Sequence, residues 1–311
     1  MNIIPTIVIH GGAGTLIEDR YSEKEKEEYY STLEASLSKG YSCLYEGGSS
    51  SEAVCVSVAV LEDSPLFNAG KGSVFSSKGT IEMDASLMNG RDLSAGAVSC
   101  LKSVKNPIYA AKEVLENCDH VLLTGEGALA FSREKKLPLM PDEYFFSEKR
   151  WEQLVEARKQ GKVLLDHSDG LGTVGAVALD KNGNLSAGTS TGGLTNRVWG
   201  RCSDSGQIGA GNYANNKTCA VSCTGTGDDF IRSVFAYDLS AISEYKNLSL
   251  EKSSKLALEK LKKLGGNGGV IVLNNEGEFI LDFISKSMYR GYKNNQKSCY
   301  VGIFSDLIER K

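Results

Sequence analysis

Residues 172–177 read Gly-Thr-Val-Gly-Ala-Val, and the apolar run that this stretch opens continues to Leu179. If the Gly172–Thr173 peptide bond were cleaved, Thr173 would become an N-terminal residue that carries a hydroxyl nucleophile and its own α-amine as the base. A free α-amine has a pKa of about 7.7–8.0, so part of it is unprotonated at neutral pH. The same letters also fit an ordinary glycine turn before a β-strand, and the rest of the chain must decide between the two readings.

The composition is that of a soluble globular protein. The chain has 311 residues, 41% hydrophobic and 24% charged, which suits one large domain or two small ones. Its net charge of −4 argues against nucleic acid or an anionic membrane surface as a partner. The N-terminal residues do not resemble a secretory signal, and no run approaches the roughly 20 apolar residues of a membrane span. We therefore expect a cytoplasmic protein.

The cysteines do not form a metal-binding pattern. Cys219 and Cys223 are close in sequence, but the histidine and cysteine partners that a zinc site needs are missing around them. All eight lie in apolar or small-residue contexts, and we interpret them as buried free thiols in a reducing cytosol. They are Cys43, Cys55, Cys100, Cys118, Cys202, Cys219, Cys223 and Cys299.

The hydrophobic patterns predict alternating groups of helices and strands. Helices are expected over residues 24–44, 51–61, 107–115, 126–135, 151–159, 228–237 and 252–264. Strands are expected over residues 6–9, 81–88, 94–100, 174–179, 185–190, 220–223, 270–274, 278–283 and 299–304. Residues 136–172 are polar and charged, and we interpret them as a flexible linker that ends at the candidate threonine. Runs of strands and pairs of helices indicate an α+β fold with stacked sheets between helices.

A Ser190-centred catalytic triad of the α/β-hydrolase type can be excluded. Residues 188–192 match the Gly-x-Ser-x-Gly pattern of the α/β-hydrolases, which would make Ser190 the nucleophile. That fold needs its catalytic histidine after the serine, and no histidine follows His167. The phosphate-binding P-loop pattern is also absent.

Small hydroxyl residues and glycines gather at two strand ends, in residues 189–193 and 222–227. Hydroxyls and bare backbone N–H groups at a sheet edge are the parts of an oxyanion hole, although turn chemistry alone also produces such clusters. Arg201 and Asp204 lie between the two clusters. Together they would suit a zwitterionic substrate, and the alternative is a surface ion pair.

These pieces together resemble one family, the plant-type L-asparaginases or isoaspartyl (β-aspartyl) peptidases of the N-terminal nucleophile (Ntn) hydrolases. The resemblance implies a single Ntn-hydrolase domain over residues 1–311, folded as a four-layer αββα sandwich. It also implies self-cleavage into an α subunit, 1–172, and a β subunit, 173–311, with the processed units paired as a homodimer. The matching segments are residues 10–14, 67–73, 83–85, 172–180, 189–196, 200–204, 209–211 and 222–227.

The resemblance also assigns roles to residues. Thr173, freed after Gly172, matches the nucleophile, and Thr191 matches the threonine that hydrogen-bonds to it. An oxyanion hole is implied for Thr224 and Gly225, and Asn68 matches a side chain that faces the nucleophile. For the substrate, Arg201 matches the clamp on the α-carboxylate, while Asp204 and the Gly227 carbonyl match the contacts to the α-ammonium group.

No cofactor is implied for catalysis, but the resemblance implies a structural sodium ion held by backbone carbonyls of one loop. That loop comprises Leu61, Glu62, Ser64, Phe67, Ala69 and Lys71. The expected substrate is a small molecule or dipeptide that contains an aspartyl unit.

The chain departs from the family pattern beside the substrate clamp. Ser203 and Gly206 replace a usual glycine and proline, and Asp228 stands where glutamate is common, which leaves substrate preference open. A glycosylasparaginase or a threonine-aspartase-like relative would share the fold, although glycine before Thr173, rather than aspartate, argues against both. An inactive, uncleaved binding protein is a third reading, against which the intact site residues argue.

Overall fold

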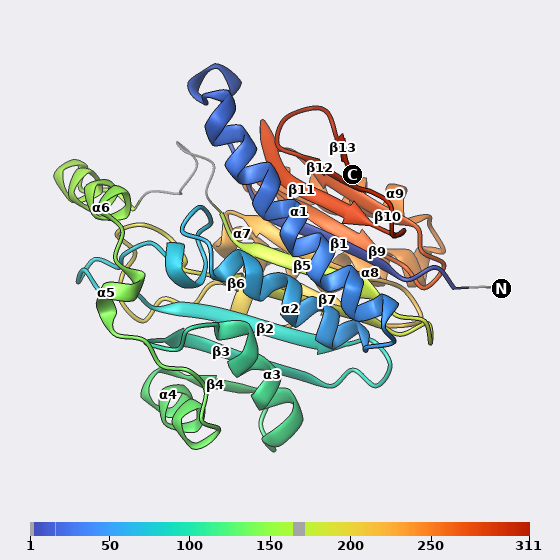
Figure 1. The fold of residues 1–311 in the computed structure, drawn as a ribbon, viewed down its shortest axis with the longest axis horizontal. Coiled ribbons are helices and arrows are strands. Elements are labelled where there is room, and N and C mark those ends of the chain that lie inside the picture. Colours follow the sequence, from blue (N-terminus) through green and yellow to red (C-terminus); the bar gives the residue numbers. More distant parts are fainter. Residues whose placement is uncertain (1–2, 16, 164–171) are drawn as a thin grey trace.

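The computed structural model describes residues 3–15, 17–163 and 172–311 (Figure 1). Within these ranges the strands form a nine-stranded sheet in the order β13-β12-β11-β1-β5-β6-β2-β3-β4 and a four-stranded sheet in the order β10-β9-β8-β7. The large sheet contains β1 (Thr6–Gly14), β2 (Met83–Asn89), β3 (Ala95–Leu101), β4 (Leu122–Thr124), β5 (Val174–Leu179), β6 (Leu185–Thr191), β11 (Ser287–Lys293), β12 (Cys299–Gly302) and β13 (Ile308–Arg310). The small sheet contains β7 (Asn212–Ala214), β8 (Ala220–Gly225), β9 (Gly268–Leu273) and β10 (Phe279–Phe283).

Helices cover the outer face of each sheet. One buried cluster joins α1 (Glu23–Tyr45), α2 (Ser50–Glu62) and α3 (Pro107–Asn117) to the large sheet. A second joins α7 (Gly227–Ser233), α8 (Phe235–Lys246) and α9 (Leu250–Lys263) to the small sheet. A third cluster lies between the two sheets, where Val177 and Ala187 meet Ile271. These three cores make four layers, and the expected αββα sandwich is confirmed.

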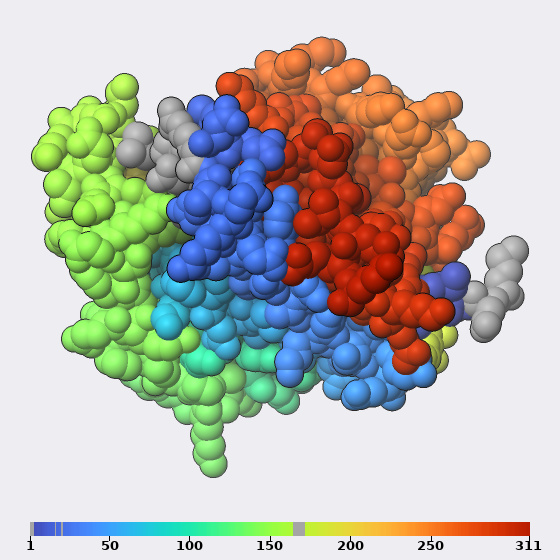
Figure 2. All heavy atoms as spheres, turned by 45° about the horizontal axis from the view of Figure 1, so that its top comes forward, coloured from blue at the N-terminus to red at the C-terminus, as the bar shows by residue number. Residues whose placement is uncertain are grey.

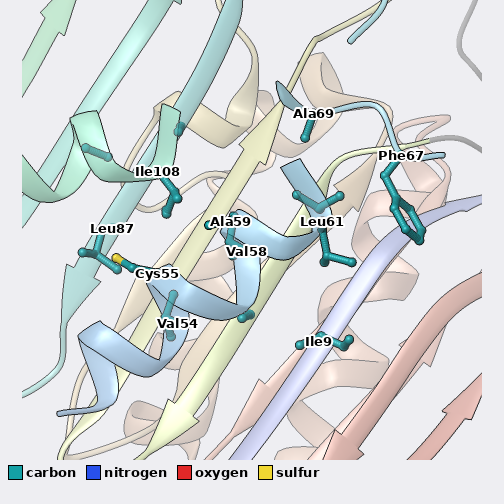
Figure 3. Close-up of a cluster of buried hydrophobic side chains, with 14 of the residues drawn as sticks. Ile9, Val54, Cys55, Val58, Ala59, Leu61, Phe67, Ala69, Leu87 and Ile108 are labelled. Carbon is teal, nitrogen blue, oxygen red and sulfur yellow. The ribbon is translucent and has the colours of Figure 1, made fainter. Parts of the chain in front are cut away.

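The packing of α2 fixes the loop that follows it (Figure 3). The helix starts at a capping box, in which Ser49 and Glu52 satisfy each other's backbone N–H groups. Its apolar face packs onto β5 and β6 and also contacts β1 and α3, and the chain then turns into a loop that carries Phe67. The Phe67 ring lies so close to β1 that a Cβ on Gly11 would be 2.4 Å from its Cε1 atom. Only glycine fits there, and the loop is held against β1.

Two expectations about the C-terminal half were wrong. The helix expected over residues 228–237 is two helices, because Val234 has a left-handed backbone with φ of 49° that separates α7 from α8. The strand over residues 299–304 ends at Gly302 and is not the last, because β13 pairs with it. Strand β11, which lies between β12 and β1 inside the large sheet, was missed altogether: it mixes polar and aromatic residues in place of a plain apolar run.

The segment expected to be a flexible linker, residues 136–172, is folded over much of its length. Short helix α5 (Asp142–Phe145) and helix α6 (Glu148–Gln160) follow α4 (Gly125–Glu134). The buried Arg150 side chain donates from Nε to the Gly72 carbonyl at 2.9 Å, and the Trp151 ring meets Phe75 edge-on. The remainder of the expected linker, residues 164–171, lies outside the described residues.

The two ends of the fold meet on one face (Figure 2), where the C-terminal residues lie against α1. Arg310 of β13 pairs with Glu27 and Glu34 of α1, with a distance of 2.9 Å from its Nε atom to Glu34 Oε2. No helix in the described part of the chain is long and apolar enough to cross a membrane.

Candidate active site

Thr173 lies at the start of β5, beside the end of β6. The two strands pair antiparallel, with Val174 opposite Ser190. Thr173 and Thr191, the next residues beyond this pair, are therefore brought together. The Thr173 hydroxyl donates a hydrogen bond to Thr191 Oγ1 at 3.1 Å. Thr191 Oγ1 also accepts the Gly193 N–H at 3.0 Å, which fixes its position. The predicted nucleophile and its predicted partner are therefore in contact, and both are buried.

The Gly172–Thr173 peptide bond is tightly enclosed. Gly12 has φ of +117°, and a Cβ on it would lie 2.4 Å from the Gly172 nitrogen. On the other side, a Cβ on Gly172 would lie 3.0 Å from Thr224 Oγ1. Glycine is required at residue 12 both by its backbone and by the approach of the Gly172 peptide.

Thr224 and Gly225, the expected oxyanion hole, end strand β8 on the opposite sheet. The Ala13 N–H donates to Thr224 Oγ1 at 3.3 Å, so the Thr224 proton is available to a second acceptor. Gly225 has φ of +150°, and a Cβ there would lie 2.2 Å from the Asn267 carbonyl oxygen. The hydroxyl of Thr224 thus lies beside the Gly172 peptide. The residue after Thr224 must be glycine, because a side chain at Gly225 would meet the Asn267 carbonyl.

A buried hydrogen-bond chain behind the nucleophile was missed by the sequence analysis. His10 Nδ1 lies 3.0 Å from the Thr173 carbonyl oxygen, and His10 Nε2 lies 2.8 Å from Ser222 Oγ. Ser222 Oγ is in turn 2.7 Å from Thr189 Oγ1. A Cβ on Gly175 would lie 2.1 Å from Ser222 Oγ, so the second glycine of the 172–177 stretch makes room for this chain.

The burial of His10 fixes its protonation state. Burial lowers the pKa of His10 to about 3, so the imidazole is neutral at physiological pH. Its partners then assign the tautomer: Nδ1–H donates to the Thr173 carbonyl, and Nε2 accepts the Ser222 hydroxyl proton. His10 belongs to the glycine-rich motif at residues 10–14, which was noticed but given no role.

Asn68 is buried near Thr191 but uses both ends of its amide on the backbone. Its Nδ2 donates to the Gly193 carbonyl at 2.8 Å, and its Oδ1 accepts the Val74 N–H at 3.1 Å. Because the Gly193 N–H binds Thr191, Asn68 holds the turn that positions Thr191.

The three expected substrate-binding residues converge on one point. A Cβ on Gly227 would lie 2.6 Å from Asp204 Oδ1 and 3.0 Å from Arg201 Nη2. Asp204 is buried, its Oδ2 has no hydrogen-bond partner, and burial raises its pKa to about 7. An unpaired buried carboxylate next to a guanidinium is suited to an ammonium group and a carboxylate on one ligand. The alternative of an Arg201–Asp204 surface ion pair does not hold, since Arg201 pairs with Asp228.

Asp84 was also missed, and it anchors the loop that carries Arg201 and Asp204. The buried carboxylate accepts the Ser203 N–H through Oδ2 and the Cys100 N–H through Oδ1, both at 2.8 Å. In the sequence analysis, residues 83–85 matched the family, but no role was assigned to Asp84. A single carboxylate bridging β3 and a distant loop leaves no local pattern in the sequence.

The loop between α2 and β2 has the chemistry of a main-chain cation site. A Cβ on Gly70 would lie 2.4 Å from the Glu62 carbonyl oxygen, and one on Gly72 would lie 2.0 Å from the Phe67 and 2.8 Å from the Pro65 carbonyl oxygen. Carbonyl oxygens thus gather around two glycines, which fits a hard cation. In the described part of the chain no cluster of three or more His, Cys, Asp or Glu side chains could hold a metal ion.

Comparisons with known proteins agree with this geometry. A family model described as asparaginase matches residues 3–303. The chain is 44% identical over 308 residues to an isoaspartyl peptidase of Escherichia coli, with 96% of each chain covered. It is 41% identical over 287 residues to a human isoaspartyl peptidase/L-asparaginase, with 91% of each chain covered. A putative isoaspartyl peptidase/L-asparaginase of Dictyostelium discoideum is 41% identical over 335 residues, with 96% of each covered.

Proposed function

The chain belongs to the asparaginase family, and from that membership we propose that it hydrolyses L-asparagine and β-aspartyl (isoaspartyl) dipeptides through an ester on Thr173. It is an enzyme, a hydrolase of the isoaspartyl peptidase/L-asparaginase type. The observation that carries the proposed mechanism is the 3.1 Å contact between the Thr173 and Thr191 hydroxyl oxygens, at a peptide bond enclosed by Gly12 and Thr224.

We propose that the reaction uses the parts of this site as follows. The freed Thr173 amine accepts the hydroxyl proton, and the oxygen attacks the side-chain carbonyl of the substrate. Thr224 and Gly225 donate to the oxyanion, a contribution that in such sites is on the order of 10²–10³ in rate for one donor. Ammonia or an amine leaves, and water hydrolyses the β-aspartyl ester. Arg201 and Asp204 hold the α-carboxylate and α-ammonium groups meanwhile.

The Thr173 hydroxyl would first cut the chain itself, before the α-amine is free. Thr173 Oγ1 would attack the Gly172 carbonyl carbon, and hydrolysis of the resulting ester would release residues 1–172 from residues 173–311. Mass spectrometry of aged protein tests this step, since the C-terminal fragment must begin at Thr173. Thr173→Ala should stay one chain, while an intact wild-type chain after long incubation would refute the proposal.

A comparison of substrates tests the reaction. We expect hydrolysis of both asparagine and β-aspartyl-leucine, with a higher kcat/KM for the dipeptide, because its second residue adds contacts usable in the transition state. The α-linked isomer should be inert, since its scissile carbonyl would occupy the place of the carboxylate at Arg201. A preference for a glycosylated asparagine would assign the chain to the glycosylasparaginases instead.

We also propose a structural sodium ion in the loop that comprises Leu61, Glu62, Ser64, Phe67, Ala69 and Lys71. The support is that the carbonyl oxygens of Glu62 and Phe67, two of the expected ligands, and of Pro65 lie close to Gly70 and Gly72, and carbonyl ligands need no particular side chains. Such an ion would stiffen the loop that carries Asn68, and so the turn behind Thr191. The expected result is a higher melting temperature in sodium chloride than in choline chloride at equal ionic strength, and equal values would refute it.

The assembly and location are proposed on the family resemblance. We propose a homodimer of processed units, which light scattering of the cleaved protein would test. We propose the cytoplasm as the location, supported by eight free cysteines, and fractionation of the source cells would test it.

A further inference from the structure

Two thiols from distant parts of the chain meet beside the substrate-binding loop. The Sγ atoms of Cys100 and Cys202 are 3.8 Å apart, and both residues are half-buried. Cys202 directly follows Arg201 in the sequence and lies two residues before Asp204. The thiols are free, as expected, but the expectation that they are buried fails for this pair and for Cys43 and Cys118, which are also half-buried.

The strand geometry explains the position of Cys100. Strands β2 and β3 pair with a register shift between Met83 and Ala85, so that Asp84 faces two residues of β3. Cys100 is one of these two, and it has a left-handed backbone with φ of 52°. Such a bulge redirects a side chain that regular pairing would point elsewhere.

Asp84 ties both cysteine segments to one carboxylate. Its Oδ1 accepts the N–H of Cys100, and its Oδ2 accepts the N–H of Ser203, the residue after Cys202. Asp84 is itself only 1% exposed. The contact between the thiols is therefore built into the fold and does not depend on two mobile side chains meeting by chance.

The contact also prepares one sulfur for reaction. Either thiol can be the donor in this contact. The hydrogen bond with Cys100 lowers the pKa of Cys202 to about 7. The pKa of Cys100 is raised by the same contact and by burial. A thiolate is the attacking form in disulfide exchange, and exchange is fastest when the thiol pKa is near the ambient pH.

We propose that Cys100 and Cys202 are an oxidation site, at which a low-molecular-weight disulfide converts the two thiols into an intramolecular disulfide that displaces the substrate-binding loop. The formation of the bond rests on the thiol geometry alone. Its effect on activity rests on the proposed function.

The exchange balances with the small disulfide as oxidant. The Cys202 thiolate attacks one sulfur of oxidised glutathione, breaks its S–S bond and releases one glutathione thiolate. Cys100 then loses its proton to solvent and attacks Cys202 Sγ in the mixed disulfide, which releases the second glutathione. The two protein thiols are oxidised, the small disulfide is reduced to two thiols, and excess reduced glutathione reverses the sequence.

Closing the bond must bring the two sulfurs closer together. A disulfide has an S–S length of about 2.05 Å, so sulfurs now 3.8 Å apart must approach by about 1.8 Å. Cys100 belongs to a strand inside the large sheet, between β2 and β4, whereas Cys202 belongs to the irregular chain between β6 and β7. Any backbone movement that the bond requires beyond rotation of the two side chains therefore falls on the loop that carries Arg201, and a displacement of about 1 Å in a positioning group can cost on the order of 10²-fold in rate.

The proposed cleavage gives the bond a direct readout. Cys100 lies before the Gly172–Thr173 bond and Cys202 after it, so the disulfide would join the two fragments covalently. Processed protein would be equilibrated in glutathione buffers of increasing oxidised fraction, quenched with acid and run on a non-reducing denaturing gel. Denaturing thiol labelling with mass spectrometry would count free cysteines, which also works on uncleaved chain.

We expect the oxidised wild type to run as one joined species with two fewer labelled thiols than the reduced protein. Its kcat/KM should fall roughly tenfold or more and recover with dithiothreitol. Cys100→Ser and Cys202→Ser should prevent both the joining and the loss, whereas Cys43→Ser, a half-buried cysteine on α1, should behave as wild type.

Three results would overturn the proposal: no thiol loss in the most oxidising buffer, a joined species with unchanged kcat/KM, or an activity loss that persists in both variants. If the reduced protein has no activity at all, the proposed function fails instead, while the thiol count still decides whether the disulfide forms.

Discussion

Arg201 is held by a carboxylate of its own chain, since its Nη2 lies 2.8 Å from Asp228 Oδ2 and its Nε lies 3.4 Å from Asp228 Oδ1. The guanidinium has two contacts with one carboxylate, the arrangement proposed for the α-carboxylate of the substrate. Asp228 is largely exposed, with a side-chain accessibility of 64%, against 17% for Arg201. An incoming carboxylate can therefore compete with Asp228 for a guanidinium that is already oriented.

Removing the charge of Asp228 should strengthen substrate binding. An exposed ion pair contributes about 0–1 kcal/mol, so Asp228→Asn should lower KM for asparagine by about two- to fivefold with little change in kcat. Asp229→Asn is the matched control, because the neighbouring carboxylate pairs with Arg232 at 3.0 Å. Initial-rate kinetics on the two variants would check this. A higher KM in Asp228→Asn would show that Asp228 orients Arg201 and does not compete with the substrate.

The close approach of Gly12 to Gly172 predicts a specific defect in self-cleavage. A Cβ at residue 12 would lie 2.4 Å from the Gly172 nitrogen, so Gly12→Ala must displace the peptide to be cut. We expect cleavage to slow by roughly tenfold or more, as follows from a misplacement of about 1 Å. A time course of fragment formation on denaturing gels would measure this rate.

Gly47→Ala separates the steric effect from backbone strain. Gly47 has φ of +97°, similar to Gly12, but nothing lies within 4 Å of an added Cβ. This variant should lose some stability and cleave at the wild-type rate. Equal slowing in both variants would mean that strain, and not the contact with Gly172, is responsible.

The hydrogen-bond chain from His10 predicts a positioning role for a histidine that never takes the catalytic proton. His10→Ala removes the donor to the Thr173 carbonyl and one of the acceptors of the Ser222 hydroxyl, which costs roughly 1–3 kcal/mol of stability. His10→Asn keeps a donor near the Nδ1 position and should recover part of the rate. Because the pKa of His10 is lowered to about 3 by burial, the pH–rate profiles of wild type and His10→Asn should have the same shape above pH 5. A profile that loses a limb in His10→Asn would assign His10 to proton transfer.

The fold could be predicted largely because its periodic segments are long. The hairpin of β5 and β6 and helices α1 and α2 follow from the spacing of their apolar residues. Strand β11 could not be found, because its burial comes from the partners on both sides and its own pattern is mixed. Residue 234 broke a helix through a backbone conformation that valine rarely adopts, which no propensity argument anticipates.

Some residues of the candidate site could also be predicted from the sequence, and others could not. The motifs pointed to Thr173, Thr191 and Thr224, which the fold brings together at adjacent strand ends. His10 and Asp84 were missed as functional residues because each acts through contacts more than 100 residues away in the sequence. Two glycines are a sign of such long-range contacts in the sequence, because Gly12 and Gly175 are required by the groups packed against them and not by turns.

Asp204 links substrate binding to pH and stability, and both effects follow from its burial. Burial raises the pKa of its carboxyl group from 3.8 to about 7, so in the empty site a falling pH protonates the group that should hold the substrate ammonium. KM should therefore rise as the pH falls below about 7, approaching tenfold per pH unit, while kcat at saturation changes less. Steady-state kinetics measured between about pH 5.5 and about pH 8.5, in steps of about half a pH unit, would reveal the trend.

The effect of pH on the contribution of Asp204 to stability has the opposite sign to that of a salt-bridged carboxylate. Because the pKa of Asp204 is higher in the folded than in the unfolded chain, its contribution to stability is fully present below the unfolded pKa and is lost as the pH rises through about 7. Asp204→Asn, which cannot ionise, should thus melt a few degrees above wild type at about pH 8 and close to it at about pH 4, while losing most substrate affinity. Thermal melts of both proteins at the two pH values would measure this, with Asp229→Asn as the control, because the Asp229 carboxylate is only half-buried and is paired with Arg232. If the melting difference were the same at both pH values, the buried charge would not be its cause, and the Asp204 carboxylate would have to be paired in the empty site.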